Sequence, residues 1–207
     1  MAGNSFTLNV PLLYGYRFTV VSSPPDGNCF FHALCRAFYI SYLTETLDGA
    51  YISRYQIVTR LRSELATELQ ATNPEDREGR SYYASIGNGA VAEMGAAVPD
   101  EFGLHSLQSL LNSNESVGEA VVFYTSIRLR KSIYIINSLT RDVYVTPELP
   151  LEQSSIILWY TPGHYDLLAL QDSNGELITH FSPQHPVIRA LHRRLQEIKR
   201  GSSNPKI

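Results

Sequence analysis

Two apolar stretches joined by a short turn constrain the fold of this chain more than any other feature. Residues 156–160 and 164–170 each have the length and composition of a strand, and residues 161–163 between them include a proline and a glycine. These residue types favour a tight turn, so the pattern predicts two adjacent antiparallel strands. Residues 132–137 form another apolar run, which predicts a further, buried strand.

Several longer segments carry apolar residues at helical spacing. In residues 54–71 an isoleucine and three leucines recur at every fourth position from Ile57 to Leu69, which is the pattern of an amphipathic helix. A small mixed sheet flanked by helices is an α+β architecture, and this is the fold class we expect. We expect helices over residues 29–43, 54–71, 104–112, 120–129 and 187–200, and short strands over 16–21, 143–146 and 177–181.

The length and composition of the chain fit one folded domain. The chain has 207 residues, of which 43% are hydrophobic and 18% are charged, so it contains enough apolar side chains to bury a full core. We expect an N-terminal arm over residues 1–15, a folded domain over residues 16–200 and a polar tail over residues 201–207.

Charge and cysteine content exclude several classes of protein. Seventeen basic residues against twenty acidic ones leave a net charge of −3, which argues against a nucleic-acid binder because such proteins carry an electropositive surface. Cys29 and Cys35 are the two cysteines of the chain. On a helix they would lie about 9 Å apart along the axis, too far for a disulfide, so a disulfide-stabilised secreted scaffold is excluded.

The sequence also lacks the signals that direct a protein to a membrane. Its N-terminus lacks the basic and then apolar pattern of a signal peptide, and its apolar runs are far shorter than a bilayer crossing requires. We therefore expect a cytoplasmic protein that binds no membrane, located in the cytosol of its own cell or of a host cell. We also expect a monomer.

One segment places a cysteine where a tight turn becomes the first turn of a helix. Cys29 follows Asp26, Gly27 and Asn28 in this turn. The amides and the dipole of a helix N-terminus stabilise a thiolate, and the amides of Gly27, Asn28 and Cys29 would bind a developing oxyanion. The alternative is a buried structural cysteine, which is our interpretation of Cys35 in the middle of the same helix.

A second segment places a histidine and an aspartate at the start of a strand. Residues two apart on a strand point to the same face. The Asp166 carboxylate can therefore accept a hydrogen bond from one nitrogen of His164 and leave the other nitrogen for a nucleophile. An ordinary polar strand start is the alternative. Taken together, the cysteine segment and the histidine segment are complementary halves of one catalytic apparatus.

Cys29, His32 and Cys35 have a regular spacing that superficially resembles that of metal ligands. On a helix these three side chains spread over about 120° of arc, and the neighbouring sequence offers no fourth ligand for zinc. We expect no metal and no organic cofactor. His32 is interpreted as a helix residue near the cysteine.

The two segments resemble the motifs of one protease family. Residues 26–34 (Asp-Gly-Asn-Cys-Phe-Phe-His-Ala-Leu) resemble the nucleophile motif of the ovarian-tumour (OTU) cysteine proteases, and residues 163–166 (Gly-His-Tyr-Asp) resemble their histidine motif. Residues 117–137 resemble the family's Trp-Gly-Gly, helix and strand segment, with Val117 where the family usually has tryptophan. The resemblance spans residues 16–171.

This resemblance implies a deubiquitinase with a papain-like OTU fold, its OTU-type peptidase domain lying over residues 16–200. OTU proteins hydrolyse the isopeptide bond between the ubiquitin C-terminus and a lysine. The resemblance makes Cys29 the nucleophile, His164 the general base and Asp166 the group that orients the base. It assigns Asp26 to the loop that shapes the oxyanion hole. The implied partners are ubiquitin, polyubiquitin chains or a ubiquitin-like modifier.

The glycine-glycine end of ubiquitin would require a narrow channel, for which Trp159, Tyr160 and Tyr165 are candidate walls. Two alternatives belong to other classes of protein. The first is a catalytically inactive ubiquitin-binding module on the same scaffold. The second is an interaction protein that acts through the basic C-terminal helix, which contains Arg189, Arg193 and further basic residues.

Overall fold

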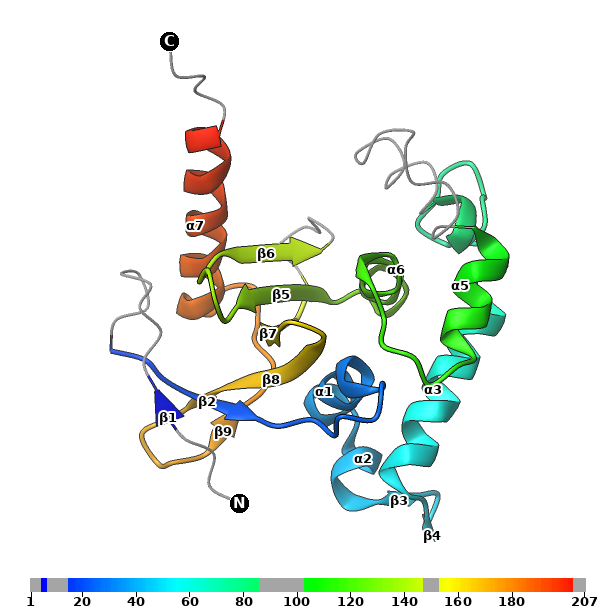
Figure 1. Cartoon of the computed structure of the whole chain (residues 1–207), viewed down its shortest axis with the longest axis horizontal. Coiled ribbons are helices and arrows are strands. Elements are labelled where there is room, and N and C mark those ends of the chain that lie inside the picture. Colours follow the sequence, from blue (N-terminus) through cyan, green and yellow to red (C-terminus); the bar gives the residue numbers. More distant parts are fainter. Residues whose placement is uncertain (1–4, 7–14, 86–102, 147–152, 203–207) are drawn as a thin grey trace. The chain divides into compact units, whose positions relative to one another are not determined.

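The structure is a computed structural model, and it describes residues 5–6, 15–85, 103–146 and 153–202. The chain divides into two compact units. The first, here called the sheet unit, comprises residues 1–23 and 131–207; the second, the helical unit, comprises residues 24–130. Figure 1 labels the elements of both.

The sheet unit is built on a seven-stranded mixed sheet. Its strands follow the order β1-β2-β8-β7-β5-β6, and β9 pairs with β8. The pair β5–β7 is parallel and the other pairs are antiparallel. The elements of this unit are β1 (Ser5–Phe6), β2 (Arg17–Val21), β5 (Ser132–Asn137), β6 (Val143–Thr146), β7 (Ser155–Thr161), β8 (His164–Gln171), β9 (Leu177–Ile178) and α7 (Pro186–Ser202).

The apolar runs of the sequence form the centre of this sheet. Strands β7 and β8 pair across the predicted turn, from Leu158 opposite Leu167 to Thr161 opposite His164. Residues 156–158 and 167–169 are fully buried, so both faces of these strands are covered. This is why the runs are continuously apolar instead of alternating with polar residues.

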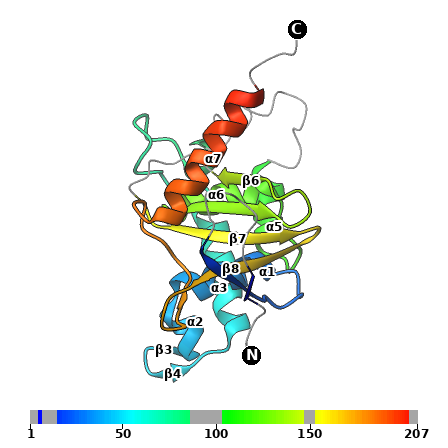
Figure 2. The ribbon, with the colours of Figure 1, turned by 90° about the vertical axis from the view of Figure 1, so that its left-hand side faces the viewer.

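Helix α7 covers one face of the sheet, as Figure 2 shows. The buried strand residues Phe18, Tyr134 and Leu168 form one core with Ile188 and Leu191 of the helix. Arginines such as Arg189 and Arg193 lie on the exposed face of α7, which gives the helix the amphipathic pattern that its sequence predicts.

The N-terminal segment contributes more to the sheet than its sequence suggests. Within the predicted arm, β1 pairs with β2 through Ser5 opposite Thr19 and Phe6 opposite Phe18. The remainder of residues 1–14 lies outside the described residues, as do residues 203–207 of the predicted tail.

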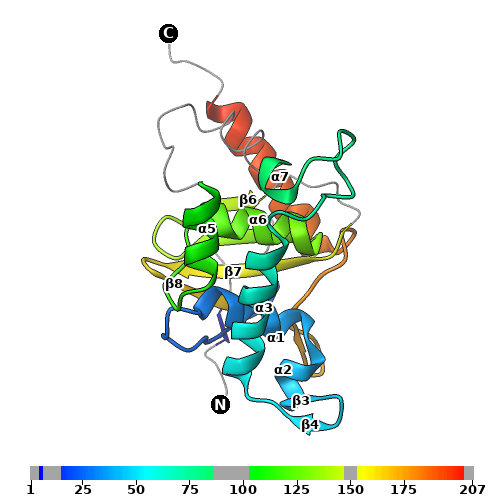
Figure 3. The same ribbon diagram turned by 90° about the vertical axis from the view of Figure 1, so that its right-hand side faces the viewer.

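The helical unit packs around its longest helix, α3. A capping box begins this helix, because Ser53 and Gln56 satisfy each other's backbone amides. Helices α1 and α5 both contact α3, and Figure 3 shows α3 with these neighbours. The elements of this unit are α1 (Cys29–Phe38), α2 (Ile40–Thr44), β3 (Thr46–Leu47), β4 (Ala50–Tyr51), α3 (Arg54–Glu68), α5 (Leu104–Leu111) and α6 (Glu119–Leu129).

The helix predicted over residues 29–43 is divided in the structure. Helix α1 ends at Phe38, and Tyr39 adopts an extended conformation with φ −111° and ψ 110° before α2 begins. The β3–β4 hairpin that follows α2 was not predicted. Its turn contains Asp48 and Gly49, both with positive φ, and an Asp-Gly pair is a strong hairpin signal.

The α+β fold class predicted from the sequence is confirmed, since the chain combines a mixed sheet with packed helices. The other predicted helices and strands are present, with boundaries that differ by a few residues. Within the described ranges, no helix has both the length and the apolar composition needed to cross a membrane.

Leu191 tests the packing of α7 on the sheet. We expect Leu191→Ala to lower the free energy of unfolding by about 2–5 kcal/mol, because it leaves a cavity in a fully buried site. Chemical denaturation monitored by circular dichroism measures this change. The matched control is Arg193→Ala on the exposed face of the same helix, which should change stability by less than about 0.5 kcal/mol. Equal effects of both variants would contradict the packing described for α7.

Candidate active site

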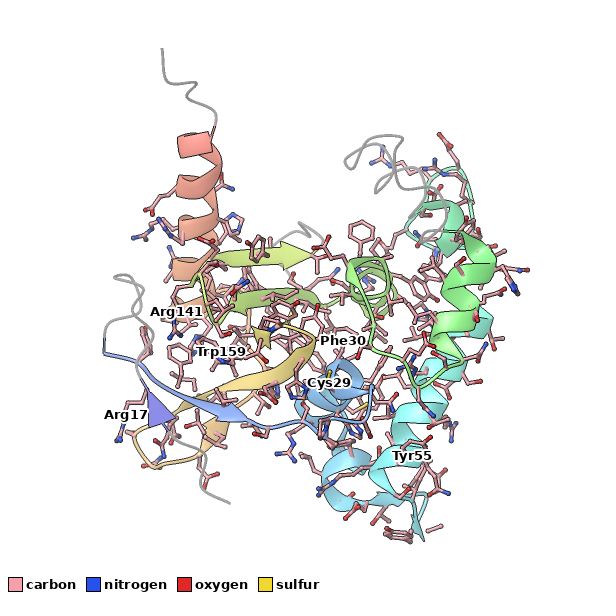
Figure 4. The ribbon with its side chains drawn as sticks, in the orientation of Figure 1. Arg17, Cys29, Phe30, Tyr55, Arg141 and Trp159 are labelled. Atoms are coloured by element: carbon pink, nitrogen blue, oxygen red, sulfur yellow. The ribbon has the colours of Figure 1, made fainter. Side chains whose placement is uncertain are left out.

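Cys29 is the first residue of α1 and follows the loop formed by residues 26–28. Its side chain is buried, and Figure 4 labels it at the start of the helix. The hydrogen bonds of the helix begin with the His32 amide, which donates to the Asn28 carbonyl over 2.9 Å. The structure thus places the cysteine at the helix N-terminus, where backbone amides and the helix dipole favour a thiolate.

Asp26 closes the loop that precedes the cysteine. Its Oδ1 accepts a hydrogen bond from the Asn28 amide over 2.9 Å, and the Asn28 side-chain amide donates to the Asp26 carbonyl over 3.3 Å. Burial by itself raises the pKa of Asp26, but the bonds from the Asn28 amide and from His32 outweigh burial and keep this pKa below its usual value. The carboxylate is therefore ionised at neutral pH and stabilises the loop as an acceptor.

His32 holds the other oxygen of this carboxylate. The distance from its Nε2 to Asp26 Oδ2 is 3.0 Å, and its Nδ1 lies 2.8 Å from the hydroxyl of Tyr42. His32 and Tyr42 are both buried. Sequence reasoning interpreted His32 as a helix residue near the cysteine and did not find this link. The available signal was its position one helical turn after Asn28, which places it next to the loop.

Gly27 permits the close approach of another segment to the loop. Its φ is +79°, and a Cβ atom at this position would lie 1.8 Å from the Asn114 carbonyl oxygen. Both the backbone conformation and the lack of space therefore require glycine here.

Asn28 occupies the N-cap position of α1, but its side chain makes no capping bond. Its Oδ1 instead accepts a hydrogen bond from Arg62 Nη1 over 2.8 Å. A buried guanidinium competes successfully with the helix amides for this acceptor, because charged donors form the stronger bond. Arg62 was not identified from the sequence, since an arginine on an amphipathic helix is ordinarily exposed.

His164 and Asp166 form the pair that the strand spacing predicts. His164 Nε2 lies 3.0 Å from Asp166 Oδ1. When Nε2 donates to this carboxylate oxygen, Nδ1 is the ring nitrogen left for a nucleophile. The same Asp166 oxygen also accepts from the Ser23 amide over 2.8 Å. This second bond fixes the carboxylate from a residue that sequence reasoning did not consider.

The register of β7 and β8 divides the three aromatic residues proposed as channel walls. Trp159 is opposite Asp166, whereas Tyr160 is opposite Tyr165. Opposed residues share a face and neighbours along a strand alternate, so Trp159 is on the face of Asp166 and the two tyrosines are on the other face.

Each aromatic group also has a neighbour on its own face. The Arg141 guanidinium lies 4.7 Å from the centre of the Trp159 ring, and both residues are labelled in Figure 4. The Tyr160 and Tyr165 rings are 5.1 Å apart. Trp159 is therefore the aromatic residue of the three that shares a face with the histidine–aspartate pair.

Cys35 differs from Cys29 in its surroundings. Burial raises the pKa of the Cys35 thiol to about 12, so this side chain stays a neutral thiol at physiological pH. Among the residues that the structure describes, no three His, Cys, Asp or Glu side chains are grouped so that they could hold a metal ion.

No family model and no curated protein matches this chain. Among solved structures, it is similar to an ovarian tumour (OTU) domain in complex with ubiquitin, with a TM-score of 0.52 and 14% sequence identity over 97% of this chain and 96% of that chain.

Two viral structures are also similar. The Hazara virus OTU bound to ubiquitin has a TM-score of 0.43 and 22% identity, covering 83% of this chain and 89% of that one. The OTU domain protease from Taggert virus has a TM-score of 0.46 and 17% identity, covering 84% and 96%. The fold assignment rests on the first similarity, which spans almost the whole of both chains. This chain has the fold of OTU domains.

Proposed function

We propose that this protein is a thiol-dependent deubiquitinase. Cys29 attacks the carbonyl carbon of the (iso)peptide bond after the C-terminal glycine of ubiquitin or a ubiquitin-like modifier. The observation that carries the proposal is the His164–Asp166 pair, whose 3.0 Å bond uses Nε2 and leaves the Nδ1 lone pair to accept a proton. The OTU fold and the place of Cys29 at the start of α1 support it.

The reaction proceeds in two steps. In the first, the Cys29 thiol gives its proton to His164 Nδ1, and the sulfur forms a thioester with the terminal glycine of the modifier. The C–N bond to the lysine breaks, and the released amine takes that proton from His164. In the second, His164 accepts a proton from water as the water attacks the thioester, which releases the carboxylate and restores the thiol. Asp166 holds the ring through both steps because it accepts from Nε2 and is itself fixed by the Ser23 amide.

The sequence predicts the amides of Gly27, Asn28 and Cys29 as oxyanion donors, and the loop geometry supports a narrower proposal. The Asn28 amide donates to Asp26, so its role in the proposal is to hold the loop in place. We assign the developing oxyanion to the backbone amides of Gly27 and Cys29, which belong to the same turn. Asp26 acts on catalysis through this loop.

The short chain connection between Ser23 and Cys29 supports a shared role for the cysteine segment and the His164–Asp166 pair. Ser23, whose amide binds Asp166, precedes Cys29 by six residues. Six residues span at most about 22 Å even when fully extended, so Cys29 stays within that reach of the residue that anchors Asp166. Cys35, the other cysteine, suits this role less because it lies inside α1, away from the helix N-terminus, and burial raises the pKa of its thiol.

The proposed substrate is ubiquitin, as a single modifier or in chains. The similar OTU domain was solved in complex with ubiquitin. We place the peptidase domain over residues 16–200 and propose that it acts as a cytoplasmic monomer. Trp159 is the proposed aromatic wall on the face of Asp166.

Labelling of Cys29 tests the proposal directly. A ubiquitin-propargylamide probe should modify wild-type protein at Cys29 and leave Cys29→Ala unmodified, which intact-mass spectrometry detects. Cys35→Ala is the matched control, because it removes the other cysteine of the same helix and should keep the labelling. The eight diubiquitin linkages should include at least one that wild type cleaves and Cys29→Ala does not. Ubiquitin binding with neither labelling nor cleavage would instead identify an inactive binding module.

Asp166 and His164 should differ in their effects on turnover. Asp166→Asn should lower diubiquitin turnover less than His164→Ala, because an amide oxygen can still accept from both His164 Nε2 and the Ser23 amide. Asp166→Ala loses this acceptor and should be slower than Asp166→Asn. Steady-state cleavage rates of the three purified variants measure this order. An Asp166→Asn variant as inactive as His164→Ala would show that the negative charge, and not ring orientation, is what Asp166 supplies.

Asp26 should affect turnover more than the reactivity of the thiol. Asp26→Ala removes the acceptor of the Asn28 amide, so the oxyanion donors lose their alignment and turnover should fall on the order of 10²-fold. Alkylation of Cys29 by iodoacetamide should change little, because the helix N-terminus that stabilises the thiolate is retained. Both rates are measured on the same preparation. Parallel losses in alkylation and turnover would show that the loop serves the thiolate.

A further inference from the structure

Arg62 lies in the middle of α3 and is 2% exposed. Its Nη1 donates to Asn28 Oδ1 over 2.8 Å and to the Glu115 carbonyl over 3.2 Å. Its Nη2 donates to the carbonyls of Leu110 and Glu115, and its Nε donates to the Leu111 carbonyl over 3.1 Å. These five bonds match the five N–H groups of a guanidinium.

The acceptors of Arg62 are neutral oxygens, although the group is charged and buried. Four of its bonds go to backbone carbonyls and one to a side-chain amide. Its guanidinium also lies 4.8 Å from the centre of the Phe31 ring. Burying a charge costs free energy that such neutral partners only partly offset. A contribution to stability therefore does not by itself explain why an arginine is buried here.

The bonds of Arg62 join two segments that meet at the cysteine loop. One is the loop itself, through Asn28. The other is the segment from Leu110 to Glu115, whose Asn114 carbonyl lies against Gly27, where a Cβ atom would approach it to 1.8 Å. Arg62 therefore holds in place both the loop and the backbone packed against it.

We propose that Arg62 is a positioning residue for the oxyanion loop of the proposed reaction. Through Asn28 it fixes the backbone of residues 27–29, so that the Gly27 and Cys29 amides are aligned before substrate binds. The guanidinium is required, because lysine offers three donors from one nitrogen and cannot reach acceptors spread around a planar fork. This inference rests on the proposed function for its kinetic consequence, whereas the loop geometry stands independently of it.

Arg62→Lys tests the assignment. We expect kcat for diubiquitin to fall on the order of 10²-fold, because small misplacements of catalytic groups cause losses of this size. KM and the rate of Cys29 alkylation should stay close to the wild-type values. Arg60→Gln is the matched control, because Arg60 is on the same helix but exposed and paired with Glu64. It should stay within about twofold of wild type, since surface ion pairs contribute little.

A double-mutant cycle separates positioning from a general loss of structure. If Arg62 acts through Asn28, Arg62→Lys combined with Asn28→Ala should be no slower than the slower single variant. If the losses in kcat of the two single variants multiply in the double variant, the proposal is overturned. A folded Arg62→Lys variant with the kcat of wild type would also overturn it.

If Arg62→Lys does not fold, variants of Asn28, which accepts a hydrogen bond from Arg62, test the same proposal. Asn28→Ala keeps the four carbonyl bonds of Arg62 and should lower kcat, whereas Asn28→Asp keeps the acceptor for Arg62 and should recover most of the loss. The rate of Cys29 alkylation, measured on the same variants, shows whether the added carboxylate of Asn28→Asp changes the reactivity of the thiol. Equal kcat values for Asn28→Ala and wild type, or for Asn28→Ala and Asn28→Asp, would overturn the proposal.

Hydrogen exchange distinguishes failure of this inference from failure of the proposed function. The Asn28 amide should exchange slowly in wild type and in Arg60→Gln, and faster in Arg62→Lys. If wild type neither cleaves diubiquitin nor reacts with the probe, the proposed function fails, and exchange alone decides the role of Arg62. Unchanged exchange at Asn28 in folded Arg62→Lys would overturn the positioning role.

Discussion

The hydrogen bonds that close the Asp26–Asn28 turn determine how the first helix presents its cysteine. Asp26 accepts from the Asn28 amide, and its second oxygen is held by His32, which is itself held by Tyr42. From the opposite direction Arg62 donates to Asn28. The turn is thus restrained through both a carboxylate and an amide side chain. The proposed oxyanion site requires such restraint, because its donors must be aligned in advance.

The sheet provides the complementary constraint on the histidine. Central strands buried on both faces are rigid, and β8 begins at His164, where the strand leaves the turn after β7. The Asp166 carboxylate accepts from both the ring and the Ser23 amide. In the proposed reaction this carboxylate orients the base, as nucleophilic catalysis commonly requires. It is fixed by the amide of Ser23, which follows β2.

Local patterns in the sequence predicted the elements well where one pattern dominated. The run Ser132–Asn137 forms a strand with four of its six residues buried, and it was predicted with its observed bounds. The helix expected over residues 29–43 was too long, because apolar residues continue at helical spacing past Tyr39 although the backbone there is extended. Helical spacing shows which side chains can lie on one face. It does not show where the backbone breaks between two helices whose apolar residues keep the same spacing.

By itself the sequence determined the α+β class, the cysteine after a turn and the histidine two residues before an aspartate. These follow from interactions between near neighbours, whose geometry is set by helix and strand periodicity. Only the tertiary structure decided which residues hold them. Arg62 is 34 residues from Asn28, and Ser23 is 143 residues from Asp166. No local periodicity encodes such pairs, because they depend on which helices and strands pack together. Packing removes donors from water, and these buried donors then need an acceptor within the protein.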